Sequence, residues 1–312
     1  MSGKTALLFA GQGTQYVGMG RDWAEADPEA RAWFDRANEV VGYDLARICF
    51  EGPEEVLTRT EHAQPGIFLV SWVAWKLLGK HCPNLRFEAT AGLSLGELTA
   101  LAVAGVFRFE DALRVVQIRG RCMQQACEAT EGGMAAVIGL GEAATREVCA
   151  EAGVFMANLN CPGQIVISGE RQALERAVAL ARARGARKAV PLPVAGAYHS
   201  PLMAAAQPAL REALQSVALS PPAVPVVSNV TARPHPDVES IRARLVEQVT
   251  APVLWEASMR YLLDSGFDRF IELGPGTVLS GFLKRIGKDV QVWNISDAGS
   301  LVATVQALRN GA

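Results

Sequence analysis

Long apolar runs, blocks of like charge and closely spaced cysteine pairs are all missing from this sequence of 312 residues. No stretch is apolar over the length that a membrane-spanning helix needs, so we expect no such helix. With 30 Lys and Arg against 32 Asp and Glu, the formal net charge is -2, which disfavours a nucleic-acid-binding surface. We also expect no cleaved leader, because a strand-like segment begins directly after Lys4.

The cysteines follow neither the spacing of a zinc site nor that of a disulfide framework. They are Cys49, Cys82, Cys122, Cys127, Cys149 and Cys161. A chain of this length, with 50% hydrophobic residues, can bury a large core without disulfides. We therefore expect reduced thiols, a cytoplasmic protein and no metal site.

A short motif of the form G-x-S-x-G is the most informative feature that is present. It runs from Gly92 through Ser94 to Gly96, between a strand-like segment at 86–91 and a helix-like segment at 95–104. A strand, a sharp turn at serine and a helix form the setting of a nucleophile elbow. Without a Cβ on either glycine, strand and helix can cross closely while the serine takes a strained conformation. A serine in an ordinary glycine-rich loop is the alternative.

A serine nucleophile needs a base at neutral pH, and the chain has four histidines. His62 precedes a predicted helix, His81 follows one, and His235 lies between prolines in a loop. His199 lies at a predicted junction between domains, where a cleft would form, and is the candidate.

Two further segments are candidates for ligand contact. Gly11-Gln12-Gly13 follows a strand-like segment and lacks the third glycine of a dinucleotide fingerprint, so it is either a close backbone approach to a ligand or a tight turn. Arg119 lies on the apolar face of a predicted helix. It either grips a substrate carboxylate or buries its stem while the guanidinium reaches a nearby carboxylate of the protein.

The order of elements predicts an α/β fold with an insertion. Residues 21–87 are predicted to be helical, with a buried apolar helix at 67–78 after Gln64-Pro65-Gly66. Residues 132–194 follow the ferredoxin-like order β-α-β-β-α-β, and prolines place the last strand at an edge. We predict a small inserted domain at 131–197 within a large α/β domain at 1–130 and 198–312, with the active site in the cleft between them.

Together these motifs resemble those of the malonyl-CoA:acyl carrier protein transacylases of type II fatty acid synthesis, over nearly the whole chain. The matching segments are Gly11-Gln12-Gly13, Gly92 to Glu97, Arg119-Gly120 with Met123, Asn158 to Gly169, Tyr198 to Met203, Gln248 and Gly274-Pro275-Gly276. The resemblance implies an α/β-hydrolase-like large domain with a parallel sheet and a ferredoxin-like small domain.

The resemblance also implies acyl transfer through a malonyl-serine intermediate. Ser94 would be the nucleophile and His199 its base. Backbone N–H groups of Gln12 and Leu95 would form the oxyanion hole. This agrees with the place of Gln12 in the glycine loop and of Leu95 directly after the elbow serine.

Substrate contacts would come from Arg119, which would bind the malonyl carboxylate, and from Gln248. The family places this glutamine near the histidine, whose ring a backbone carbonyl orients; without the family, a glutamine in water would be expected. Two positions depart from the family. Leu93 replaces a frequent histidine and favours a more apolar acyl pocket, and Tyr198 replaces a frequent phenylalanine, keeping an aromatic wall and adding a hydroxyl.

The implied partners are malonyl-CoA, as a substrate rather than a cofactor, and acyl carrier protein; we expect no cofactor, nucleic acid or membrane, and a monomer. Because carrier proteins are acidic, a basic rim should meet them. The candidate clusters are Arg182, Arg184, Arg187 and Lys188, and Lys284, Arg285 and Lys288. A polyketide-pathway acyltransferase, a thioesterase or esterase of the α/β-hydrolase type, and a non-catalytic scaffold remain alternatives.

Overall fold

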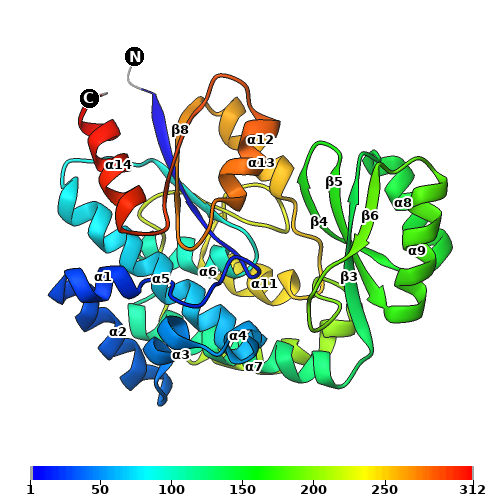
Figure 1. Ribbon diagram of the computed structural model, residues 1–312, viewed down its shortest axis with the longest axis horizontal. Coiled ribbons are helices and arrows are strands. Elements are labelled where there is room, and N and C mark those ends of the chain that lie inside the picture. Colours follow the sequence, from blue (N-terminus) through cyan, green and yellow to red (C-terminus); the bar gives the residue numbers. More distant parts are fainter. Residues whose placement is uncertain (1–2, 311–312) are drawn as a thin grey trace.

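The computed structural model describes residues 3–310 and contains two β-sheets, each with its own helices (Figure 1). The larger sheet has five strands, all parallel, in the order β7-β2-β1-β8-β9. Its strands are β1 (Lys4–Phe9), β2 (Ala89–Gly92), β7 (Val226–Val227), β8 (Phe267–Leu273) and β9 (Gln291–Ile295). The predicted parallel sheet is confirmed, and the carboxyl ends of β1 and β2 meet where Phe9 pairs with Gly92.

The central strand β1 is buried on both faces, as its run of apolar residues predicts. Leu7 and Phe9 belong to a core cluster that includes residues of α5 (Thr60–His81), α6 (Leu95–Val103) and α7 (Phe109–Glu128). Ala6 and Leu8 point the other way, into a cluster with α12 (Trp255–Asp264) and α13 (Val278–Ile286). Helices therefore cover both sides of the sheet and leave the carboxyl ends of its strands available for a site.

Between residue 3 and β2 the structure has five helices, all within the region 21–87 that was predicted to be helical. Before α5 come α1 (Arg21–Ala26), α2 (Pro28–Val41), α3 (Leu45–Glu51) and α4 (Glu54–Thr58). The predicted start of the apolar helix at residue 67 is wrong, because α5 begins at Thr60 and Pro65 lies inside it. The Thr60 N–H donates to Gln124 Oε1 at 2.9 Å, so a side chain of α7 caps the helix.

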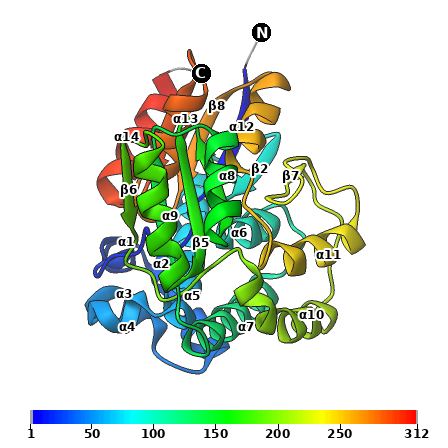
Figure 2. The same ribbon diagram turned by 90° about the vertical axis from the view of Figure 1, so that its right-hand side faces the viewer.

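The smaller sheet is antiparallel, with the order β4-β5-β3-β6. Its strands and the two helices between them follow one another in the chain as β3 (Gly132–Ile138), α8 (Glu142–Ala152), β4 (Phe155–Cys161), β5 (Gln164–Glu170), α9 (Arg171–Ala183) and β6 (Lys188–Pro191). The ferredoxin-like order and the edge position of the last strand are confirmed. Figures 1 and 2 show α8 and α9 on the outer face of this sheet, so its other face is turned toward the larger part.

The chain enters and leaves the smaller part at one place. A Cβ built on Gly132, at the start of β3, would lie 2.9 Å from the Cβ of Ala197, which follows β6. This arrangement is that of an insertion, although the exact bounds 131–197 stay a prediction.

The rest of the larger part comprises a 3-10 helix at Pro201–Ala206 and three α-helices, α10 (Gln207–Gln215), α11 (Val238–Gln248) and α14 (Ala298–Asn310). Within residues 3–310, every helix is too short or too polar to cross a bilayer.

Candidate active site

The elbow motif forms the strand, turn and helix that its sequence predicts. Ser94 lies between β2 and α6 with φ 55° and ψ -105°, a conformation that costs free energy in a residue with a side chain. A Cβ on Gly92 would lie 2.0 Å from the carbonyl carbon of Gly96, and a Cβ on Gly96 would lie 2.2 Å from the carbonyl oxygen of Phe9. Both glycines are therefore required for the close crossing, and the elbow geometry is confirmed.

His199 lies against this serine. Its Nε2 is 2.9 Å from Ser94 Oγ, and its Nδ1 is 2.8 Å from the carbonyl oxygen of Gln248. A carbonyl only accepts, so the proton sits on Nδ1 and leaves Nε2 to accept the serine O–H. The exposed fractions are 8% for Ser94 and 4% for His199, so the pair is largely shielded from water.

The His199 ring is held in its neutral form. Burial, together with the positive charge of Arg119, lowers its pKa to about 4. A neutral ring at physiological pH is the protonation state that a general base needs.

Arg119, on α7, is 1% exposed and has no carboxylate within ion-pair distance among residues 3–310. Its Nη2 donates to Ser94 Oγ at 3.0 Å and to Gln248 Oε1 at 2.9 Å, and its Nη1 donates to Gln64 Oε1 at 2.7 Å. Burial lowers the pKa of this guanidinium to about 10, so it stays charged at neutral pH. The alternative in which it reaches a carboxylate of the protein is wrong, because its partners are neutral oxygens. A buried cation without a direct counter-anion is suited to an anionic ligand.

Two backbone donors lie beside the elbow. Gln12 follows the carboxyl end of β1, and Leu95 is the first residue of α6. Within the described chain, neither N–H donates to a protein acceptor. A Cβ on Gly11 would lie 2.5 Å from the carbonyl oxygen of Leu93, so the glycine loop presses directly against the elbow. Two free N–H groups near a nucleophile are what an oxyanion hole requires.

Ser94 and His199 open into a cavity of about 410 Å³ between the two sheets. The larger part lines it with Gln12, Leu93, Tyr198 and, from α13, Val278 and Phe282. The inner face of the antiparallel sheet lines it with Met134, Ala136, Asn158, Asn160 and Val166. The predicted place of the site, in the cleft between the two parts, is therefore where this cavity lies. Arg119 and Gln248 lie behind the serine rather than in the cavity wall.

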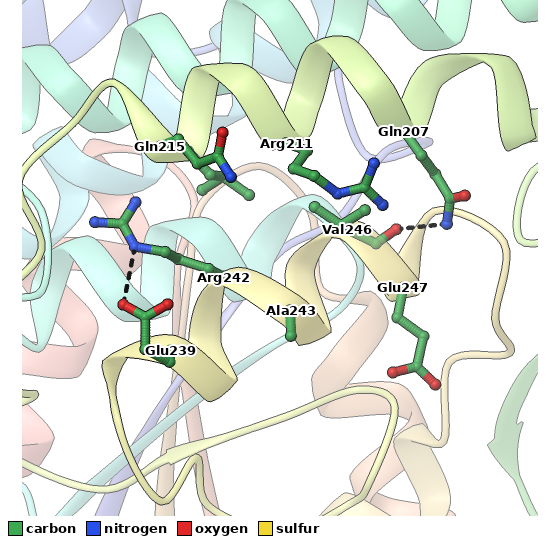
Figure 3. Close-up of a pocket in the computed structure, with 9 residues that line it drawn as sticks. Gln207, Arg211, Gln215, Glu239, Arg242, Ala243, Val246 and Glu247 are labelled. Atoms are coloured by element: carbon green, nitrogen blue, oxygen red, sulfur yellow. Dashed lines mark hydrogen bonds and ion pairs between the residues drawn. The ribbon is translucent and has the colours of Figure 1, made fainter.

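A second hollow, of about 620 Å³, lies between α10 and α11 and contains none of the predicted site residues. Figure 3 shows its polar lining, in which Arg242 pairs with Glu239 and Gln207 bonds to the Val246 carbonyl. The described residues that line it include no serine, threonine or cysteine, and its charged groups are surface side chains.

Three residues of the site were not predicted. Gln64 contacts the guanidinium, Asn229 accepts the Ser94 N–H at 2.6 Å, and the buried Glu97 receives hydrogen bonds from the residues around the elbow. Glu97 directly follows the elbow motif, in the first turn of α6. A glutamate in the first turn of a helix usually faces water, so its burial was not expected. For Gln64 and Asn229 the local sequence carries no signal.

The chain is similar to known proteins over nearly its whole length. The family model described as "Acyl transferase domain" matches residues 6–306. The chain is 40% identical to the "Malonyl CoA-acyl carrier protein transacylase" of Bacillus subtilis (strain 168), over 98% of this chain and 98% of that protein. A crystal structure of the malonyl-CoA:acyl carrier protein transacylase from Xanthomonas oryzae pv. oryzae is 42% identical, with a TM-score of 0.94 over 98% of this chain and 99% of that one.

A third similar structure is a complex. It is described as "type II PKS acyl-carrier protein in complex with its malonyl-transacylase", is 36% identical and has a TM-score of 0.93 over 97% of this chain and 99% of that one.

Proposed function

The chain belongs to the acyl transferase family, and on that premise we propose that it transfers the malonyl group of malonyl-CoA to the phosphopantetheine thiol of acyl carrier protein, in fatty acid biosynthesis. The observation that carries the proposal is the 3.0 Å contact between Arg119 Nη2 and Ser94 Oγ. A cation at the nucleophile itself suits an acyl group that ends in a second carboxylate, because guanidinium matches carboxylate in two-point geometry.

In the first half of the reaction, His199 Nε2 takes the proton of the Ser94 hydroxyl while Oγ attacks the thioester carbonyl. The developing oxyanion is stabilised by the N–H groups of Gln12 and Leu95. The Gln248 carbonyl accepts from Nδ1 and stabilises the imidazolium. The C–S bond breaks, and the CoA sulfur leaves with the proton from His199.

In the second half, the thiol of the carrier protein enters the cavity and gives its proton to His199. Its sulfur attacks the malonyl-serine ester, and Ser94 leaves with that proton. During both halves the malonyl carboxylate would replace the hydrogen bonds that Arg119 makes to Ser94 Oγ and Gln248 in the free protein.

The main competing reaction is hydrolysis. A thioesterase of the α/β-hydrolase type would orient its histidine with a carboxylate, whereas the Nδ1 partner here is a backbone carbonyl. Radiolabelled malonyl-CoA in a single turnover separates the two reactions. A transferase forms an acyl-enzyme that persists in water and discharges when a thiol is added; rapid release of free malonate would instead indicate a hydrolase.

The depressed pKa of His199 predicts an unusual pH profile. Because its pKa is lowered to about 4, the base stays unprotonated until the pH falls toward that value. We expect kcat/KM, which reports on the free enzyme, to decline with a midpoint near pH 4 rather than near the ordinary histidine value of about 6.5. Stopped-flow pH jumps keep the protein folded during the measurement. Acetyl-CoA, which has no second carboxylate, is the control, and a midpoint near 6.5 with both substrates would contradict the assignment.

The contacts of the two predicted basic clusters favour one of them as the docking surface for the carrier protein. In the first cluster, Arg184 pairs with Glu147 and Glu151, which offsets its charge, and Arg182 donates to the Ala189 carbonyl. Arg187 and Lys188 have no carboxylate within ion-pair distance among residues 3–310. The second cluster, Lys284, Arg285 and Lys288, has no carboxylate within ion-pair distance in the described part of the chain. Arg285 donates to Gln164 Oε1 at 2.6 Å, and Gln164 lines the active-site cavity. We therefore assign docking to this second cluster.

Charge reversal tests that assignment. Lys284→Glu combined with Lys288→Glu should raise the KM for carrier protein about tenfold or more, since like charges replace complementary ones. The rate with free pantetheine as acceptor should not change. Arg184→Glu combined with Arg187→Glu is the matched control, and the opposite ranking of the two pairs would refute the assignment.

We further propose that the protein acts in the cytoplasm as a monomer. All six cysteines are free thiols, which supports a reducing compartment. A polyketide pathway is the alternative to fatty acid synthesis. Kinetics on purified carrier proteins of both kinds distinguish the two, since the physiological partner should have the higher kcat/KM.

A further inference from the structure

Glu97 is a fully buried carboxylate that has no Arg or Lys within ion-pair distance among residues 3–310. It lies in the first turn of α6, three residues after Ser94, and is 0% exposed. Its Oε2 accepts from the Asn229 backbone N–H at 3.0 Å and from Gln248 Nε2 at 2.7 Å, and its Oε1 accepts from His235 Nε2 at 2.8 Å. Burying a carboxylate is costly, so three converging donors indicate a site built to hold this group.

The donors that Glu97 gathers also hold the nucleophile. The Asn229 side chain accepts the Ser94 N–H at 2.6 Å and donates to the Gly92 carbonyl at 2.7 Å. Gln248 Nε2 donates to the Ser94 carbonyl at 3.1 Å. Both backbone polar groups of the strained serine are therefore bound by side chains of the two residues that contact the Glu97 carboxylate, Asn229 through its backbone N–H and Gln248 through its side chain. The Glu97 backbone N–H also donates to the Ser94 carbonyl, at 3.1 Å. Such strain persists only where the surroundings fix the conformation.

The same glutamine reaches the other two functional groups. Its carbonyl oxygen accepts from His199 Nδ1, and its Oε1 accepts from Arg119 Nη2. The Gln248 side chain thus links the guanidinium to the Glu97 carboxylate, and the negative charge of Glu97 opposes the fall in the pKa of Arg119. A single residue, Asn229 or Gln248, connects the Glu97 carboxylate to each of the nucleophile, the base and the cation.

We propose that Glu97 is a positioning residue for acyl transfer: its carboxylate fixes Asn229 and Gln248, which together set the geometry of Ser94, His199 and Arg119. The Glu97 side chain is fully buried and does not line the cavity, so its carboxylate acts through these two residues. The inference rests on the proposed acyl transfer, and measuring the wild-type single turnover first separates a failure of that function from a failure of this role.

The test compares two substitutions at one position. Glu97→Met keeps the length of the side chain and removes both acceptors. Glu97→Gln keeps one side-chain oxygen. That oxygen can still accept hydrogen bonds from Asn229 and Gln248, while the NH2 group of the new glutamine faces His235. Because a misplacement of about 1 Å can cost on the order of 10²-fold, Glu97→Met should slow single-turnover acylation by about that factor. The KM for malonyl-CoA should stay within about threefold, and Glu97→Gln should restore most of the rate.

Glu272→Met is the matched control. Glu272 is also a buried carboxylate, and it accepts the N–H groups of Leu279 and Ser280 at the start of α13. Both Met variants should lower the melting temperature, but only Glu97→Met should lower the acylation rate. The proposal would be overturned if Glu97→Met folds and acylates at the wild-type rate. It would also be overturned if Glu97→Gln is as slow as Glu97→Met, because the loss of rate would then come from the lost negative charge.

If Glu97→Met does not fold, Asn229→Ala carries the test. It removes the acceptor of the Ser94 N–H while the Asn229 backbone can still donate to Glu97. Slower acylation with an unchanged KM would support the positioning role, and a wild-type rate would overturn it.

Discussion

Replacement of Ser94 by alanine should abolish the acyl-enzyme and lower the transfer rate by a factor on the order of 10⁴–10⁶. The hydroxyl is the only group within hydrogen-bond distance of both His199 Nε2 and Arg119 Nη2 in the described part of the chain. Without it, the thiol of the carrier protein would have to attack malonyl-CoA directly, and the base would have no nucleophile to activate. Steady-state transfer and denaturing gels after incubation with radiolabelled malonyl-CoA measure the two effects.

Ser168→Ala is the matched control for this variant. Ser168 is fully buried in β5, and its Oγ has no hydrogen-bond partner in the structure. Its removal should leave both the label and the rate unchanged. Substantial transfer by Ser94→Ala, with a label still attached to the protein, would refute the assignment of the nucleophile.

Arg119→Ala should lower kcat/KM for malonyl-CoA much more than kcat/KM for acetyl-CoA. Truncating one member of a buried, hydrogen-bonded charge pair costs about 2–5 kcal/mol, so the loss with malonyl-CoA should be on the order of 10²-fold or more. Acetyl-CoA has no free carboxylate and cannot form that pair. The ratio of the two kcat/KM values is the measurement, because it cancels changes that affect both substrates equally.

Arg119→Lys supplies the internal control. Lysine keeps the charge but has no planar fork, so it should give an intermediate ratio between the two substrates. Equal losses with malonyl-CoA and acetyl-CoA in Arg119→Ala would show that the arginine supports the elbow and does not select the acyl group.

The elbow and the inserted sheet could be predicted because their signals are local. Gly92, Ser94 and Gly96 stand between a strand and a helix, and the crossing leaves no room for a Cβ at either glycine. The alternation of strands and helices over residues 132–194 similarly specifies the ferredoxin-like order, and prolines mark its edge strand. His199 was selected by its place at a junction, which is also a property of the chain order.

The parts that could not be predicted depend on distant segments. Asn229 reaches Ser94 from 135 residues away, and Gln64 reaches Arg119 from 55 residues away. The start of α5 was misplaced for the same reason, since its cap is Gln124 on α7. Whether a buried arginine finds a protein carboxylate is also decided by tertiary packing. The sequence therefore left two interpretations of Arg119. The contacts exclude a protein carboxylate as its partner, and binding of a substrate carboxylate stays a prediction.

The chemical roles of Gln12, Leu95 and Gln248 stay predictions, supported by two free N–H groups and by the carbonyl at His199 Nδ1. Loss of one oxyanion-hole donor lowers the rate by a factor of about 10²–10³, but a backbone N–H cannot be removed by changing a side chain. The acyl-enzyme itself is therefore the more accessible evidence.

The most direct test of the account is to map the acyl group. Stoichiometric radiolabelled malonyl-CoA is mixed with the wild-type protein, the reaction is quenched in acid, and the labelled peptide is sequenced. The account predicts one label per chain on Ser94, which is chased quantitatively onto carrier protein when that partner is added before the quench. Label on another residue, or transfer to carrier protein without a labelled enzyme, would contradict it.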